Sequence, residues 1–399
     1  MLSFEDARRR LLGLARVLGE ERVSVEAAAG RVLRESITSP ADHPPFDQST
    51  MDGYAVRAAD CVQNTKMPLA DIESRAGGPM PSPLPSGHGM RIFTGAPMPD
   101  GADAVVIQEE VTRQGATIAF EKAPPKGRFV RPRGQDLKKG DIALESGTRL
   151  GPAHCALVAS LDRAWVRAAL RPSVTILATG DELRDPGTAG GDPTAIPDAN
   201  GIALAALVRF AGASARIAPS VGDDRDATRA AIRNAIASSD VVVTVGGASV
   251  GDHDHVKPAM EAEGVTLDFW KVAIKPGKPL IVGRKGDVIV LGVPGNPASA
   301  MVTFALFGVP LLRAMQGDRR VLPTSVRAKL AKPIEREAGR LELYRAVLEE
   351  GVVTTLGNQA SGAIVSMARA NALAVVQAET TSLAAGDAVD VLPFGELGL

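Results

Sequence analysis

The stretch Asp240-Val-Val-Val-Thr-Val-Gly246-Gly-Ala-Ser249-Val-Gly251-Asp252-His-Asp254 decides the fold, because five β-branched residues lead directly into a polar, glycine-rich loop. A continuous run of this kind is typical of a strand buried on both faces of a parallel sheet. Ligands of open α/β sheets bind at the carboxyl ends of such strands. The loop glycines would let backbone N–H groups approach an anion, with Ser249 as a further donor and Asp252 or Asp254 as a cation ligand. The alternative is an ordinary Gly-Gly turn.

The segments around this stretch alternate between strand and helix patterns. Strands are predicted at residues 173–178, 214–218 and 240–245, with helices at 200–210 and 225–238 between them. This βαβαβ order predicts a three-layer α/β domain with a parallel sheet and right-handed crossovers.

Carboxylates follow three successive strands of the predicted sheet. Glu182, Asp223 and Asp254 each lie in the loop after a strand, so parallel strands would bring them to one rim. Carboxylate oxygens are ligands that divalent cations prefer, so we predict that these three residues share a metal or ligand site.

The length of 399 residues predicts several domains, because a single hydrophobic core stops growing near about 250–300 residues. Short apolar bursts between glycines and prolines at 67–150, and again after 319, indicate β-rich segments. We therefore predict a multidomain α/β architecture. Its parts are an N-terminal helix and linking domain (1–40 and 141–170), a β-rich domain (41–140), the three-layer α/β domain (171–318) and a C-terminal β-barrel (319–399).

The composition excludes several classes of protein. The chain is 45% hydrophobic and 23% charged, with a net charge of -1, which argues against non-specific attraction to nucleic acid or membrane surfaces. The two cysteines, Cys61 and Cys155, are far apart and suggest neither a disulfide framework nor a zinc site, so we expect a reducing cytoplasm. No secretory signal opens the chain.

One long segment lacks charge. Residues 288–312 carry no charged side chain, but a Pro-Gly-Asn-Pro sequence interrupts them at 294–297. The apolar part that follows is shorter than the ~20 residues of a membrane helix. We predict a loop and then a buried helix.

Two further segments have the composition of anion sites. Lys271, Lys275 and Lys278 flank apolar residues and a Pro-Gly turn that would hold them in place. Residues 128–141 form a basic cluster that contains a carboxylate, for which a solvated hairpin and a lid over a polyanionic substrate are the alternatives. Asp52 lies in a turn that follows two prolines.

Taken together, these motifs resemble the molybdopterin molybdenumtransferase family, which includes MoeA and the E domain of gephyrin. The resemblance covers essentially the whole chain in collinear order. It rests on Ser49-Thr-Met-Asp52-Gly-Tyr-Ala55, Arg91-Ile-Phe-Thr94-Gly-Ala96, Gly134-Gln-Asp136, Thr179-Gly-Asp-Glu182-Leu183, Gly246-Gly-Ala-Ser249-Val-Gly251, Lys275-Pro-Gly-Lys278-Pro and Pro294-Gly-Asn-Pro297.

The resemblance implies a fold, a reaction and partners. The fold would be a four-domain homodimer whose α/β domain is like that of the molybdopterin adenylyltransferases. The reaction would insert molybdate into adenylylated molybdopterin and release AMP, with Mg²⁺ assisting. A molybdopterin adenylyltransferase and molybdoenzyme apo-proteins are the further partners implied.

Functional residues are carried over onto matching positions. The implied catalytic residues are Asp52, Thr94, Asp136, Glu182, Asp223, Asp254, Lys271 and Lys275. The predicted substrate-binding residues are Gly246, Gly247, Ser249, Gly251, Lys278, Pro294, Gly295, Asn296, Pro297, Ser299, Arg131, Arg340 and Ser361. Asp52 and Thr94 would complete the site of the partner subunit, so the loop after Val245 would not work in a monomer.

The chain departs from the family pattern at a few positions. His253 and His255 stand where aromatic residues are frequent, and Ala199 where a serine is common, which bears on contacts with the adenylate. Two alternatives remain: an adenylyltransferase that acts one step earlier on molybdopterin, and a non-catalytic scaffold with the same fold.

Overall fold

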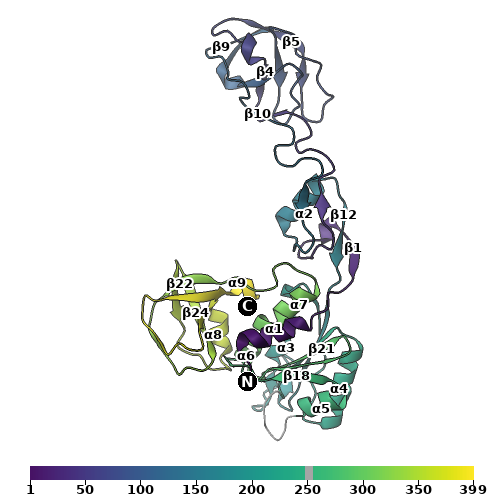
Figure 1. The fold of residues 1–399 in the computed structure, drawn as a ribbon, viewed down its shortest axis with the longest axis vertical. Helices are drawn as coiled ribbons and strands as arrows, with labels where there is room; N and C mark the ends of the chain where they lie inside the picture. Colours follow the sequence, from purple (N-terminus) through teal and green to yellow (C-terminus); the bar gives the residue numbers. More distant parts are fainter. Residues whose placement is uncertain (248–254) are drawn as a thin grey trace. The chain divides into compact units, whose positions relative to one another are not determined.

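The computed structural model describes residues 1–247 and 255–399, and the chain forms two compact units (Figure 1). The first unit comprises Met1–Glu35, Gly147–Pro152 and Trp165–Leu399, and the second comprises Ser36–Ser146 and Ala153–Ala164. The first contains the α/β and C-terminal domains expected from the sequence.

The α/β domain is built on a sheet with the strand order β16-β13-β17-β21-β20-β18. The first four strands in this order are parallel to one another, as predicted: β13 pairs with β16 and β17, and β17 pairs with β21. Their bounds are β13 Ser173–Ala178, β16 Ser214–Ile217, β17 Val241–Val245, β18 Thr266–Trp270, β20 Ile281–Lys285 and β21 Val288–Val293.

The prediction of a parallel sheet is wrong at the edge formed by β20 and β18. β20 runs antiparallel to both β21 and β18, so the sheet is mixed. The cause is the two-residue connection Gly286-Asp287, which closes a tight hairpin between β20 and β21 with Lys285 opposite Val288. A connection this short can join only antiparallel strands.

Helices cover both faces of the sheet, which confirms the three-layer arrangement. Val241, Val243 and Val245 of β17 pack into the cluster that contains Leu204 of α3, whereas Val242 packs with Ile232 of α4 on the other face. This alternation follows from the two-residue period of a strand. The covering helices are α3 Ala199–Phe210, α4 Arg225–Ala237 and α5 Val256–Ala262.

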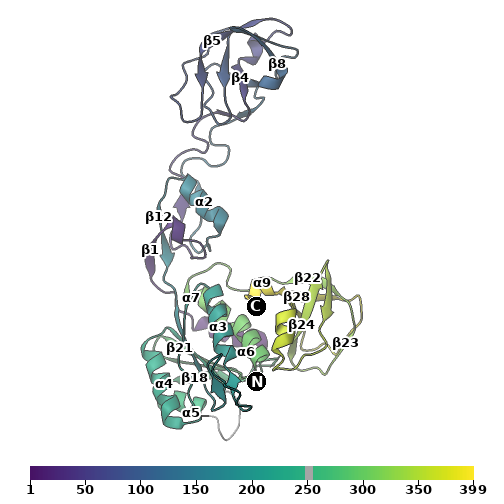
Figure 2. The same ribbon diagram turned by 180° about the vertical axis from the view of Figure 1, so that it is seen from behind.

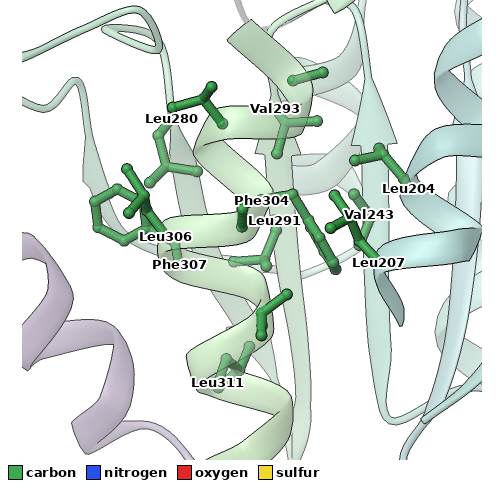
Figure 3. Packing of buried hydrophobic residues seen from close by; sticks show 14 of the residues in the cluster. Leu204, Leu207, Val243, Leu280, Leu291, Val293, Phe304, Leu306, Phe307 and Leu311 are labelled. Atoms are coloured by element: carbon green, nitrogen blue, oxygen red, sulfur yellow. The ribbon is translucent and has the colours of Figure 1, made fainter. Parts of the chain in front are cut away.

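From Pro297 on, the uncharged segment and the three residues after it form a helical run through the core of the first unit. It consists of α6 Pro297–Thr303, a π-helical turn Phe304–Gly308 and α7 Val309–Met315. The wider turn accommodates Pro310, which lacks the N–H of a regular helix. Figure 3 shows Phe304 pointing toward Val243 and Leu207 of the sheet layer.

By length and composition alone, the run Pro297–Met315 could cross a membrane, with a mean hydropathy of 1.6. However, 83% of it is buried inside the protein. The predicted buried helix is thus confirmed.

The C-terminal domain is a closed β-barrel, as predicted. The strand order β24-β25-β22-β28-β26 closes because β26 also pairs with β24, and β19 (Ile274–Lys275) of the α/β domain adds to β24. Figure 2 labels β22, β24 and β28 of this domain. The bounds are β22 Val326–Leu330, β23 Ile334–Glu335, β24 Leu341–Glu349, β25 Val352–Thr355, α8 Ile364–Arg369, β26 Ala372–Val376, β27 Ser382–Leu383, β28 Ala388–Pro393 and α9 Phe394–Leu397.

The N-terminal helix α1, Phe4–Gly13, is shorter than the predicted helix at 3–18. Ser3 caps it by accepting the Asp6 N–H, and Phe4 packs edge-on against Phe307 at 5.3 Å between ring centroids. The helix ends after Gly13, a poor helix former. Leu14 and Leu18 nevertheless pack against the core. After the helix, β1 Glu20–Ser24 pairs with β12 Trp165–Ala169.

The second unit is β-rich, as predicted. Its main sheet has the order β7-β4-β6-β5-β9-β8, and its short strands pair as β10 with β3 and β11 with β2. The bounds are β2 Ile37–Thr38, β3 Gln48–Ser49, β4 Gly53–Val56, β5 Met67–Ser74, β6 Gly89–Ile92, β7 Ala104–Ile107, β8 Val111–Gln114, β9 Thr117–Phe120, β10 Val130–Arg131 and β11 Ile142–Leu144, with α2 Pro152–Ser160 beyond them.

Candidate active site

Two adjoining cavities lie at the carboxyl ends of β13 and β17, where the sequence predicts a site. The smaller encloses about 220 Å³ and the larger about 640 Å³. Thr179, Glu182, Gly246 and Gly247 line both, so the loops after β13 and β17 form a shared wall. The predicted residues Ser249, Gly251 and Asp254 lie outside the described part of the chain.

The smaller cavity brings together two of the three predicted metal ligands. Glu182 and Asp223 both line it, together with Thr228 and His255. Asp181 positions the second loop, because its Oδ1 accepts the Asp223 N–H at 2.9 Å. The loop can come this close because residue 222 is glycine: a β-carbon there would press on the Asp181 carboxylate.

The donor set of the smaller cavity fits a magnesium ion. Within residues 1–247 and 255–399, no group of three or more His, Cys, Asp or Glu side chains is placed to hold a metal. Mg²⁺ usually binds through one or two protein carboxylates, with water and substrate phosphates completing its shell. Glu182 and Asp223 supply that number.

The larger cavity has a wall of stiff loops. The predicted residues Pro294, Gly295, Asn296 and Pro297 line it, as does Pro279. Asn200, at the start of α3, donates from Nδ2 to the Gly295 carbonyl at 2.7 Å. Its buried Oδ1 has no partner among the described residues, although Asn200 lines the cavity. Asn200 thus contributes to the cavity wall and ties α3 to the loop of Gly295, while its Oδ1 is buried behind that wall.

The Lys275 to Lys278 turn is held against α6 and carries Pro279 into the larger cavity. Gly277 has a φ of 109°, and a β-carbon there would collide with the Thr303 hydroxyl. Val272 donates its N–H to the Lys278 carbonyl at 3.0 Å, which closes the turn. The sequence-based expectation of a held lysine turn agrees with these contacts.

Lys271 and two of the three predicted serines lie on the surrounding elements. The Nζ of Lys271 lies 3.8 Å from the centre of the Trp270 ring. Ser299 of α6 is only 4% exposed. The Ser361 carbonyl accepts the Ala298 N–H at 3.1 Å, which ties the loop before α8 to the start of α6.

A buried carboxylate that the sequence analysis missed gathers two predicted residues. Glu342 of β24 is 3% exposed, and it accepts from the Arg340 Nε at 3.1 Å, the Lys275 Nζ at 3.4 Å and the Tyr344 hydroxyl at 2.7 Å. Burial alone would raise the pKa of Glu342, but these donors and the Arg336 charge bring it below its ordinary value. The signal was the Arg-x-Glu-x-Tyr alternation on one strand face, which brings all three side chains together.

The remaining predicted residues belong to the second unit and form two pairs. Asp52 accepts from the N–H and the hydroxyl of Thr94, and Arg131 forms an ion pair with Asp136. The Thr94 N–H, with the Thr94 hydroxyl next in importance, holds the pKa of Asp52 below its ordinary value. Both carboxylates are thus anchored by donors.

These features define a class of protein. An α/β protein that binds an anionic, phosphate-bearing ligand has cavities of this kind at the carboxyl ends of its parallel strands. The glycines in the cavity wall, the two carboxylates and the neighbouring cations are typical of such a site.

Comparison with known proteins narrows this class. The model of the MoeA N-terminal region (domains I and II) matches residues 2–161, a probable molybdopterin binding domain matches 175–314, and the MoeA C-terminal region (domain IV) matches 327–394. A molybdopterin molybdenumtransferase of Haemophilus influenzae is 35% identical over 405 residues and covers 100% of both chains. One from Nostoc is 35% identical over 386 residues, covering 93% of this chain and 88% of that one. The chain belongs to the molybdopterin molybdenumtransferase family.

Solved structures agree with this assignment. A molybdopterin biosynthesis moeA protein of Pyrococcus horikoshii superposes with a TM-score of 0.86 at 28% identity, covering 98% of this chain and 100% of the other. A second crystal structure of a moeA protein from Pyrococcus gives a TM-score of 0.80 at 31% identity, with 99% of both chains covered. The resemblance and the fold class predicted from the sequence are both confirmed.

Proposed function

We propose that this protein is the enzyme that inserts molybdate into adenylylated molybdopterin, releasing AMP and completing the molybdenum cofactor. The observation that carries the proposal is the pair of adjoining cavities with a shared wall, one bearing two carboxylates and the other beside a cationic turn. Relatives that align over 100% and 93% of the chain carry the name molybdopterin molybdenumtransferase.

The chemistry of the substrate matches the division between the cavities. Adenylylated molybdopterin contains a phosphoanhydride and a fused heterocycle. The polar smaller cavity, lined by Glu182 and Asp223, suits the phosphates with their counter-ion. The larger cavity, with four prolines among its lining residues and the amide residues Asn200 and Asn296 beside them, suits the heterocycle.

Molybdate needs cationic donors near the dithiolene. Lys275 and Arg340 supply them at the junction of the α/β domain and the barrel. In the reaction the two dithiolene thiols bind molybdenum and give up their protons, and one molybdate oxygen leaves with those protons as water. A second water molecule hydrolyses the phosphoanhydride, which releases AMP and leaves the phosphate on the pterin. Donors that hold the oxyanion in place reduce the entropy cost of bringing the reactants together.

A magnesium ion is part of this proposal. Glu182 and Asp223 would hold it, with Asp254, outside the described residues, as the predicted third ligand. When bound, Mg²⁺ would offset the charge that develops on the departing AMP. The Asp181 contact to the loop of Asp223 keeps that carboxylate facing the cavity.

We further propose the assembly that the family resemblance implies. In a homodimer, Asp52 and Thr94 of one subunit would complete the site of the other. We also propose a cytoplasmic location. There, a molybdopterin adenylyltransferase would deliver the substrate, and molybdoenzyme apo-proteins would receive the product.

An adenylyltransferase is the less favoured activity. Such an activity would need only the segment matched by the molybdopterin binding domain, whereas this chain also matches the MoeA N-terminal and C-terminal regions. A scaffold without activity would have no need of the Asp52 to Thr94 and Lys275 to Glu342 arrangements.

The proposal is tested by cofactor formation. Purified protein supplied with adenylylated molybdopterin, Mg²⁺ and molybdate should yield a product that restores activity to an apo-molybdoenzyme. The Asp254→Ala variant should still form the dimer but yield no product. Formation of adenylylated molybdopterin from molybdopterin and ATP would instead favour the adenylyltransferase.

A further inference from the structure

The feature that carries a further inference is the buried carboxylate of Glu342, which lies where the α/β domain meets the barrel. Lys275 of β19 is paired in register with Glu342 of β24, so the two side chains start from directly opposed positions. Arg340 lies two residues before Glu342 on the same side of the chain and reaches its other oxygen. One carboxylate thus connects cations from two domains.

The cations around Glu342 differ in exposure. Arg336 is 3% exposed in its side chain, and its guanidinium donates to carbonyls, including that of Arg340 at 2.7 Å. Lys275 and Arg340 are 50% and 41% exposed. Arg340 contacts Glu342 only through Nε, and its two Nη groups make no hydrogen bond within the described residues. Those groups and the remaining Lys275 donors are therefore free for a ligand.

The charges around Glu342 do not cancel. Lys275, Arg336 and Arg340 contribute three positive charges against one negative charge, while Tyr344 stays neutral because burial and the Glu342 carboxylate raise its pKa to about 12. An excess of two positive charges matches a tetrahedral dianion. Without the carboxylate the cations would repel one another, and Lys275 would lose the contact that orients it.

We propose that Glu342 is the positioning residue of the oxyanion site: it holds Lys275 and Arg340 in a single geometry and sets the excess charge to that of a dianion. The proposal rests on the proposed function, which places molybdate at these cations. Glu342 itself does not touch the oxyanion. Its removal should therefore affect molybdate binding more than turnover at saturating molybdate.

The Glu342→Gln variant separates positioning from simple charge. If Glu342 only opposed anions, its neutralisation would tighten molybdate binding. If it positions the cations, the KM for molybdate should rise about 10-fold or more while kcat at saturation stays within about 3-fold, because displaced contacts cost at least this much. Tighter or unchanged molybdate binding would overturn the proposal.

A matched control is available in the same chain. Glu263 is also buried, with a side chain 6% exposed, and it pairs with Arg229 and Arg233 of α4 rather than with Lys275 or Arg340. Glu263→Gln removes an equivalent charge, so it should leave the KM for molybdate unchanged. A similar rise in both variants would show a general loss of stability and contradict the positioning role.

Equilibrium binding tests the inference apart from the reaction. Isothermal titration of molybdate, and of the tetrahedral monoanion perrhenate, into the full-length protein needs no pterin. Wild-type protein should prefer molybdate, and Glu342→Gln should bind it about 10-fold more weakly. Equal affinity of both proteins for molybdate overturns the role of Glu342 while leaving the proposed function intact.

A second variant, Glu342→Asp, tests the same role if Glu342→Gln does not fold. Glu342→Asp keeps the charge but withdraws it by one methylene, so it should raise the KM for molybdate less than Glu342→Gln while retaining the preference over perrhenate. Wild-type affinity in Glu342→Asp would contradict a role that depends on geometry.

Discussion

The Asp52 carboxylate accepts two hydrogen bonds from Thr94, one from the backbone N–H at 2.7 Å and one from the hydroxyl at 2.9 Å. Both bonds end on the same oxygen, Oδ1. Within residues 1–247 and 255–399, no hydrogen bond ends on the other oxygen, Oδ2. Two residues that are 42 positions apart in the sequence therefore form one unit on the surface of the β-rich domain.

Removal of the Thr94 hydroxyl should raise the pKa of Asp52. Thr94→Val keeps the shape of the side chain and the backbone donor but deletes the second hydrogen bond, which favours the ionised carboxylate. NMR titration of the Asp52 carboxyl carbon measures the change, with Thr94→Ser as the control that retains the hydroxyl. An unchanged pKa in Thr94→Val would show that the hydroxyl bond is not formed in solution.

Glu263 should make stability depend on pH in acid. Arg233 and Arg229 lower its folded-state pKa from 4.5 to about 2, so the carboxylate stabilises the fold above pH 4.5, and this contribution is lost as the pH falls toward 2. Glu263→Gln should therefore lower Tm at neutral pH. The difference from wild type should shrink as the pH falls from 4.5 to 2, and a difference independent of pH would refute the ion-pair account.

Gly277→Ala should disturb the lysine turn through collision with Thr303. The added methyl group meets the Thr303 hydroxyl, and overpacking of this kind costs about 1–3 kcal/mol beyond the cost of the positive φ. The control is Gly339→Ala, because Gly339 has a similar φ of 114° but no atom within 4 Å of the new methyl. Urea unfolding of both variants isolates the steric term. Equal losses would mean that the turn is not packed on α6.

The metal proposal predicts a specific effect of Asp223. Asp223→Asn should raise the Mg²⁺ concentration needed for half-maximal AMP release by about 10-fold, since a carboxylate ligand is lost. Asp224→Asn is the matched control, because asparagine caps the start of α4 as well as aspartate does. A normal Mg²⁺ requirement in Asp223→Asn removes that residue from the metal site.

Much of the fold was predictable because its signals are local. The β-branched run of β17 and the aspartate caps of α3 and α4 give strand and helix by short-range physics. The reversed β20 was missed because a βαβαβ series suggests that parallel pairing continues. Only the Gly286-Asp287 hairpin breaks the series.

The site was less predictable because it depends on contacts between distant segments. Glu182 and Asp223 could be placed together from strand ends alone. Glu342 could not, because its importance appears only when β19 pairs with β24 and brings Lys275 to it from 67 residues away. The place of Asn200 in the cavity wall likewise depends on how α3 meets the loop of Gly295.

The most direct test of molybdate insertion is the release of AMP from adenylylated molybdopterin, measured with and without molybdate in the presence of Mg²⁺. We predict AMP release that depends on molybdate, saturates with it and is accompanied by one metal atom in each product molecule. AMP released at the same rate without molybdate would contradict the assignment of this enzyme to metal insertion.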